Sequence, residues 1–92
     1  MSQDGRFLIS EDVVHRELDG ETIVLSLESG MYFGLNATGT RVWRLIEEGA
    51  TAAQMIETIS RECSHPQDEV RSDVEALLSV LQAKGLVCPA LR

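Results

Sequence analysis

The stretch SGMYFGLNATGTRVW, residues 29–43, decides the fold because a sheet ends and a helix begins within it. Its Ser29-Gly30 pair is a turn signal, and the next five residues, 31–35, are mostly apolar and typical of a strand. Asn36 can then cap a helix by accepting a backbone N–H, and Trp43 falls within the helical pattern that follows. The stretch therefore predicts a strand that passes directly into a helix.

Side chains alternate along that strand, so its two aromatic residues point to opposite faces. Met31, Phe33 and Leu35 share one face, whereas Tyr32 and Gly34 share the other. We expect one aromatic side chain to anchor the strand to the core and the other to lie near the sheet edge, where Gly34 lets another backbone approach closely. The sequence leaves open which aromatic residue takes which position.

Two turn signals upstream divide residues 6–35 into three extended runs. Asp19-Gly20 suits a two-residue hairpin, since both central positions then need positive φ, and Glu28-Ser29-Gly30 forms the second turn. The middle run alternates as in a sheet that is covered mainly on one side, with Ile23, Leu25 and Leu27 on one face and Val24 and Ser26 on the other. These features predict a three-stranded antiparallel meander.

Two helices are expected next. The first runs from the Asn36 cap to a stop at Gly49, with Trp43 packed in the core. The second begins at Thr51, which forms a capping box with Gln54.

The third helix is expected to be the longest. Ser64 is its expected cap, Pro66 lies in its first turn, and Gly85 ends it, after which residues 86–87 return to the core. Its apolar stripe spans about 160°, wider than one packed neighbour needs, so part of it can face a groove. The stripe is made of Val70, Val74, Leu77, Leu78, Val80 and Leu81. The order βββααα predicts one α+β domain over residues 1–92, with residues 1–5 disordered.

Composition and charge exclude several classes of function. Hydrophobic residues make up 43% of the chain and charged residues 25%, which is ordinary for a folded domain. Fifteen acidic and eight basic side chains give a net charge of -7, which disfavours nucleic acid and anionic membranes as partners. The sequence has neither a membrane-spanning run nor a secretory signal pattern, so the cytoplasm is the expected compartment.

No pattern of catalytic or metal-binding residues is present. Cys63 and Cys88 lack the spacing of a zinc site, so we expect two free thiols, at least one of them partly buried. His15 and His65 have no set of further ligands at suitable spacing. We therefore expect a protein that is not an enzyme and needs no metal or cofactor.

Four segments together resemble the PqqD-like family: LDGETIVLSL, SGMYFGLNATGTRVWRLIEEG, PQDEVRSDVEALLSVLQAKG and the closing GLV. The most specific part is YFGLNATGTRVW. The resemblance covers about residues 13–87. Members are small winged helix-turn-helix domains that act as recognition elements for ribosomally made, post-translationally modified peptides (RiPPs). They bind the leader segment of a precursor and deliver it to modifying enzymes. With its GMYFGLN run, this chain is closer to the stand-alone members of lasso-peptide and related clusters than to the protein of pyrroloquinoline quinone (PQQ) synthesis itself.

The resemblance also implies a binding site. In the family, the leader adds as a strand beside the third strand and lies in a groove whose other wall is the third helix. On this chain the strand is residues 31–35 and the helix is residues 67–84. The implied peptide-binding residues are Met31, Tyr32, Phe33, Gly34, Leu35, Val70, Asp73, Val74, Leu77, Val80 and Leu81.

The implied partners are a precursor leader peptide and a modifying enzyme, which could be a leader peptidase, a cyclase or a radical SAM enzyme. Two copies could also pair through the exposed strand as a homodimer. One alternative function is a peptide chaperone of PQQ biosynthesis that works with a radical SAM enzyme. Another is a winged helix-turn-helix regulator of DNA, although the acidic third helix has the wrong sign for the major groove. A third is a scaffold that only dimerises or stabilises an enzyme.

Overall fold

The computed structural model describes residues 6–89, so the disorder expected for residues 1–5 lies outside the described residues. The α+β architecture is confirmed, with an antiparallel meander followed by three helices. Two short strands were not expected. In chain order the elements are β1 (Phe7–Ile9), β2 (Val13–Leu18), β3 (Glu21–Ser26), β4 (Tyr32–Leu35), α1 (Ala37–Glu47), α2 (Ala52–Cys63), α3 (Gln67–Ala83) and β5 (Val87–Pro89).

The meander has the strand order β2-β3-β4, which leaves β2 and β4 as its edges. Asp19 and Gly20 have φ values of 54° and 81°, which confirms the two-residue hairpin with both central positions in the left-handed region. The second turn ends at Gly30, with φ 76°, and returns the chain as β4. Each of the three extended runs predicted from the sequence therefore contains one strand of the meander.

The first extended run contains two strands instead of one. The chain turns between β1 and β2, and β1 pairs with β5 in a separate two-stranded antiparallel sheet. The Ser10 hydroxyl donates to the Gly85 carbonyl at 2.7 Å, and the Ser10 N–H donates to the Leu86 carbonyl at 3.0 Å. The expected order βββααα is thus incomplete, because the return segment after α3 is a strand that closes on the start of the domain.

Two of the three expected helix caps are confirmed. Asn36 accepts from the Gly39 N–H at 2.9 Å, and Thr51 and Gln54 form the reciprocal capping box. The cap predicted at Ser64 is wrong: Ser64 ends α2 in the left-handed conformation with φ 57°, and Pro66 precedes α3 without a side-chain cap. The α2–α3 connection is so short that Ser64 serves the helix before it.

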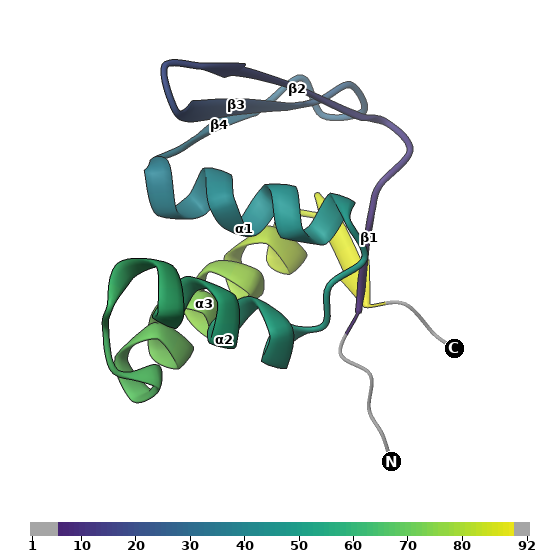
Figure 1. Cartoon of the computed structure of the whole chain (residues 1–92). Coiled ribbons are helices and arrows are strands. Elements are labelled where there is room, and N and C mark those ends of the chain that lie inside the picture. The colour runs from purple at the N-terminus through teal and green to yellow at the C-terminus, as the bar shows by residue number, and fades with distance from the viewer. Residues whose placement is uncertain (1–5, 90–92) are drawn as a thin grey trace.

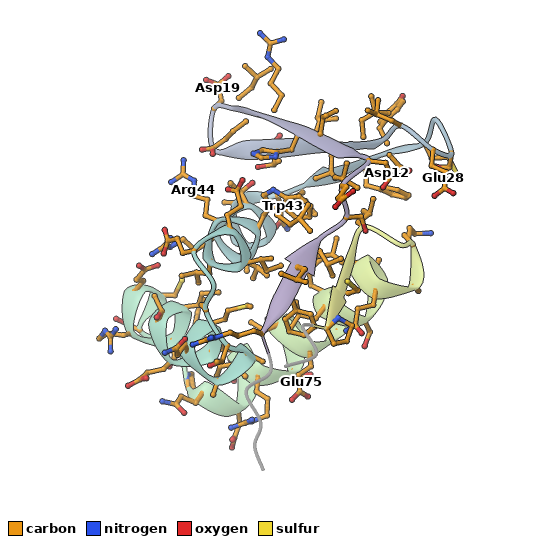
Figure 2. All side chains as sticks on the ribbon, turned by 90° about the vertical axis from the view of Figure 1, so that its right-hand side faces the viewer. Asp12, Asp19, Glu28, Trp43, Arg44 and Glu75 are labelled. Carbon is orange, nitrogen blue, oxygen red and sulfur yellow. The ribbon has the colours of Figure 1, made fainter. Side chains whose placement is uncertain are left out.

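The elements form layers, with α1 between the meander and the pair α2 and α3 (Figure 1). Trp43 is 1% exposed and lies beneath the sheet, which confirms its expected core position (Figure 2). The inner face of β3 presents Val24 to α1, together with the buried Thr22 and Ser26. The outer face is therefore the more apolar one, and Ile23 and Leu27 on it are exposed.

Candidate functional site: a groove between an edge strand and a helix

β4 is an edge strand whose second side has no strand partner among residues 6–89. The Ser26 N–H donates to the Met31 carbonyl at 2.9 Å where β3 and β4 begin to pair. In an antiparallel ladder every second residue of a strand bonds to the same neighbouring strand, so Met31, Phe33 and Leu35 direct their backbone groups toward β3. The N–H and C=O groups of Tyr32 and Gly34 therefore point to the free edge. Four backbone polar groups are thus available to an added strand.

The structure assigns the two aromatic residues of β4 to opposite faces. Phe33 packs against the core, whereas Tyr32 is 71% exposed on the outer face of the sheet. Leu35 is buried at the end of the strand, and Met31, just before it, is 55% exposed. The expected division of the aromatic pair is confirmed, with Phe33 as the anchor.

α3 faces this edge with a narrow stripe of four residues. Asp73, Leu77, Val80 and Lys84 follow one another at intervals of four, three and four, so they lie on one side of the helix. Leu77 is half-buried, and Val80 is 49% exposed. Asp73 and Lys84 are exposed at the two ends of the stripe.

The remaining implied residues of α3 have a different position. Val70, Val74 and Leu81 are buried in the core cluster, so their side chains support the helix from beneath. Only Asp73, Leu77 and Val80 of the implied set offer side-chain surface on this helix. The wide apolar stripe predicted from the sequence therefore consists of two adjacent faces of α3. One face packs on the core, and the other faces β4.

The end of β4, the start of α1 and the middle of α3 enclose a groove of about 430 Å³. It is lined by Gly34, Leu35, Asn36, Thr38, Gly39, Asp73 and Leu77. Sequence reasoning had not assigned Asn36, Thr38 and Gly39 to the site, since their cap and helix-start pattern predicts only local structure. It also placed Lys84 on the helix without a role, although the spacing from Val80 and Leu77 could have indicated it.

Lys84 lies farther along the same stripe of α3. Its Nζ lies 5.1 Å from the centre of the Phe33 ring, a cation–π geometry that links the end of α3 to β4. Asp73 and Lys84 therefore lie at the two ends of the α3 stripe that faces β4.

A second hollow lies on the outer face of the sheet beside the same stretch. It has a volume of about 450 Å³ and shares Gly34, Leu35 and Asn36 with the groove. A Cβ built on Gly34 meets no atom within 4 Å, so this position is open rather than crowded. A strand added along β4 would thus find a hollow for its side chains on each face.

Buried contacts hold β4 in place against α1. The Thr22 hydroxyl donates to Thr40 Oγ1 at 2.8 Å, and the Thr40 hydroxyl donates to the Leu35 carbonyl at 3.4 Å. A Cβ on Gly39 would lie 3.0 Å from Leu35 Cβ, an unusually tight contact, so glycine avoids crowding where the helix and the strand approach each other. The position of the edge strand is therefore fixed by tertiary packing rather than by β3 alone.

Residues 6–89 contain no group of three or more His, Cys, Asp or Glu side chains that could hold a metal ion. Cys63 and Cys88 are free, as expected, but both are exposed, which corrects the prediction that at least one is partly buried. Cys63 is the last residue of α2, and Cys88 lies in the short β5 strand near the chain end. Across the described part of the chain, no helix is long and apolar enough to cross a membrane.

These features define a small α+β domain with an open edge strand beside a helix-lined groove, an architecture suited to strand addition. Residues 21–87 match the family described as coenzyme PQQ synthesis protein D (PqqD), and the chain belongs to this family. A comparison with curated proteins gave no match.

Two solved structures share the fold. The chain is similar to "TbiB1 in Complex with the TbiA(beta) Leader Peptide", with 36% identity, a TM-score of 0.84, and coverage of 91% of this chain and 98% of that one. It is also similar in fold to "Lasso peptide synthetase B1 complexed with the leader peptide", with 24% identity, a TM-score of 0.79, and coverage of 91% and 99%.

Proposed function

We propose that this protein is a non-catalytic adaptor that binds the leader segment of a ribosomally made precursor peptide and presents it to a modifying enzyme. The observation that carries the proposal is the open edge of β4 beside the groove, in a chain 36% identical to a protein solved with a leader peptide. The leader would add as a strand to the outward N–H and C=O groups of Tyr32 and Gly34.

Backbone pairing and side-chain pockets contribute separately to such binding. The backbone bonds are the same for every extended peptide, so they supply affinity without selecting a sequence. Alternate side chains of the leader would enter the groove beside Leu77 and the outer hollow beside Gly34. Of the implied peptide-binding set, the side chains of Val70, Val74 and Leu81 act as the support of the groove wall.

The likeness to TbiB1, which was solved with the TbiA(beta) leader peptide, supports leader binding. The GMYFGLN run, which resembles the stand-alone members of lasso-peptide clusters, favours a pathway of the lasso-peptide type over PQQ biosynthesis. In that pathway the enzymes that receive the leader would be a peptidase and a cyclase. A radical SAM enzyme is the corresponding partner in the second case. The leader-binding surface is the same in both.

Fluorescence anisotropy with a labelled leader, taken from the precursor encoded beside this gene, tests the proposal. We expect saturable binding with a micromolar or lower Kd. Amide signals should shift in β4 and α3 and stay unchanged at the hairpin tip, Asp19-Gly20. Absence of saturable binding, or shifts that avoid β4, would contradict the proposed function.

A further inference from the structure

The α3 stripe beside β4 carries opposite charges at its two ends. Asp73 lines the groove beside residues 34–36, and Lys84 lies farther along the same stripe of α3, beside Phe33. The α3 side chains between them on this stripe, Leu77 and Val80, are apolar. The stripe therefore has an anion at one end, a cation at the other and a hydrophobic middle.

Neither charge is neutralised by an ion pair within residues 6–89. β4 has the sequence YFGL, and the first turn of α1 is ATGT, so neither element adds a charged side chain to the groove. Arg71, the other basic residue of the segment 67–84, lies about 160° around the helix from Asp73, by the 100° turn per residue. Asp73 and Lys84 are thus free to meet charges on a ligand.

The distance between the two charges determines how many residues of an extended ligand lie between their partners. Eleven residues of helix separate them, which is about 16 Å at 1.5 Å per residue. An extended chain covers that distance in about five residues at 3.3 Å each. Positions on the same face of a strand differ by an even number, so the complementary charges fall four or six residues apart.

The direction of the ligand follows from the direction of β4. The strand runs from the Lys84 end of the stripe toward the Asp73 end. Antiparallel addition continues the pattern of the meander and is the slightly more stable arrangement. An antiparallel ligand would then have its N-terminal part beside Asp73 and its C-terminal part beside Lys84.

Resting on the function proposed above, we propose that the groove selects leader segments by charge order. The preferred segment has a basic side chain followed, four or six residues later, by an acidic one, with apolar same-face residues between them. The basic residue pairs with Asp73, and the acidic residue pairs with Lys84. Charge order fixes both the direction and the register of the added strand, which backbone pairing alone leaves undetermined.

The test uses two versions of the neighbouring precursor's leader, with Lys and Glu placed in either order at two same-face positions four or six residues apart. Each exposed ion pair is a weak contact, but reversal turns two attractions into two repulsions, so we expect the Lys-then-Glu version to bind about three- to tenfold more tightly. This preference should shrink in 1 M salt, where the Debye length is about 3 Å.

A charge-exchanged protein gives the decisive measurement. Asp73→Lys combined with Lys84→Glu keeps the net charge and should invert the preference between the two leaders. The matched control is Glu75→Lys combined with Arg71→Glu, which makes the same exchange on the opposite side of α3 and should leave the preference unchanged. Figure 2 shows Glu75 on the side of the molecule away from the meander.

Each outcome has one meaning. Equal binding of the two leaders by the unmodified protein, or a preference that the Asp73 and Lys84 exchange fails to invert, overturns the charge-order proposal and leaves the adaptor function standing. A Glu-then-Lys preference overturns it as well, because it indicates parallel addition. Failure of every version to bind, including the unaltered leader, counts against the adaptor function itself.

Discussion

The two edges of the meander differ in how they meet solvent. β2 carries His15, Arg16 and Glu17 in its middle, and it is tied to α1 by two contacts between charged or ionisable groups. Glu17 Oε1 accepts from Arg44 Nε at 3.0 Å, and His15 Nε2 lies 3.3 Å from Glu47 Oε2. β4 has no charged residue of its own and borders the groove, whose lining combines Leu35 and Leu77 with the polar side chains of Asn36, Thr38 and Asp73.

This difference shows that only one edge is protected against pairing. Charged side chains on an edge strand discourage the addition of another strand, because pairing would strip water from them. β2 has this protection in its middle, at His15, Arg16 and Glu17, whereas β4 offers a short, neutral stretch with a glycine at its third position. A domain that must bind an extended peptide and avoid aggregation needs one edge of each kind.

The largest expected effect comes from closing the open edge. Gly34→Pro removes an outward N–H and places a ring in the path of the added strand, yet proline is tolerated on edge strands. A peptide carbonyl would lose its partner, so binding of the leader should weaken by about 2–3 kcal/mol, roughly 30- to 150-fold. Anisotropy titration measures the loss, and the thermal unfolding midpoint confirms that the variant folds.

Glu17→Pro is the control on the protected edge, since the Glu17 N–H points away from β3 by the same alternation that starts at the hairpin. It should lower stability slightly and leave leader binding unchanged. If both proline variants lose binding equally, or if neither does, β4 is not the strand that pairs.

The next effect concerns how the open edge is held. Thr40→Val removes the acceptor of the buried Thr22 hydroxyl and the donor to the Leu35 carbonyl. An unpaired buried hydroxyl is costly, so the free energy of unfolding in urea should fall by about 1–2 kcal/mol. Thr22→Val should lower the free energy of unfolding less in the Thr40→Val variant than in the unmodified protein, because it removes the hydroxyl donor that Thr40→Val leaves unpaired. Strictly additive costs would show that the two hydroxyls are not coupled.

A smaller effect is expected where the protected edge meets α1. Glu17→Gln weakens the exposed pair with Arg44 and should lower the free energy of unfolding by less than about 1 kcal/mol. The difference from the unmodified protein should vanish in 1 M salt, because exposed charges are then screened. A loss that persists at high salt would mean that Glu17 acts through packing instead of charge.

The smallest effect lies outside both edges and provides a baseline. Hydrogen bonds from the Arg41 side chain, at 2.9 and 2.7 Å, lower the pKa of Glu62 from its ordinary value of 4.5. The folded state therefore gains stability above that value and loses it as pH falls through the lower folded pKa. Glu62→Gln should flatten this part of the curve of unfolding midpoint against pH. An unchanged slope would contradict the assignment.

Local chemistry made much of this fold predictable from the sequence. Asp19-Gly20, Asn36 and the Thr51 capping box each specify a structure within a few residues, and all three are confirmed. The alternation along β4 likewise divided Tyr32 from Phe33. It could not say which faces inward, since that depends on where α1 packs.

Non-local contacts account for what was missed. The pairing of β1 with β5 joins segments about 80 residues apart, and neither three-residue strand has a pattern of its own. Ser64 was assigned to the wrong helix, because a residue between two helices can serve either one. The stripe of α3 gave the correct helix but merged its core face with its groove face, so Val70, Val74 and Leu81 were placed with Leu77 and Val80.

The two-stranded sheet of β1 and β5 has a further consequence for how this unit is joined to other chains. Because Phe7 pairs with Pro89, the polypeptide enters and leaves the described domain at neighbouring points, away from β4 (Figure 1). Such a unit can be spliced into a surface loop of a larger enzyme, or extended at either end, without stretching its host or obstructing the open strand.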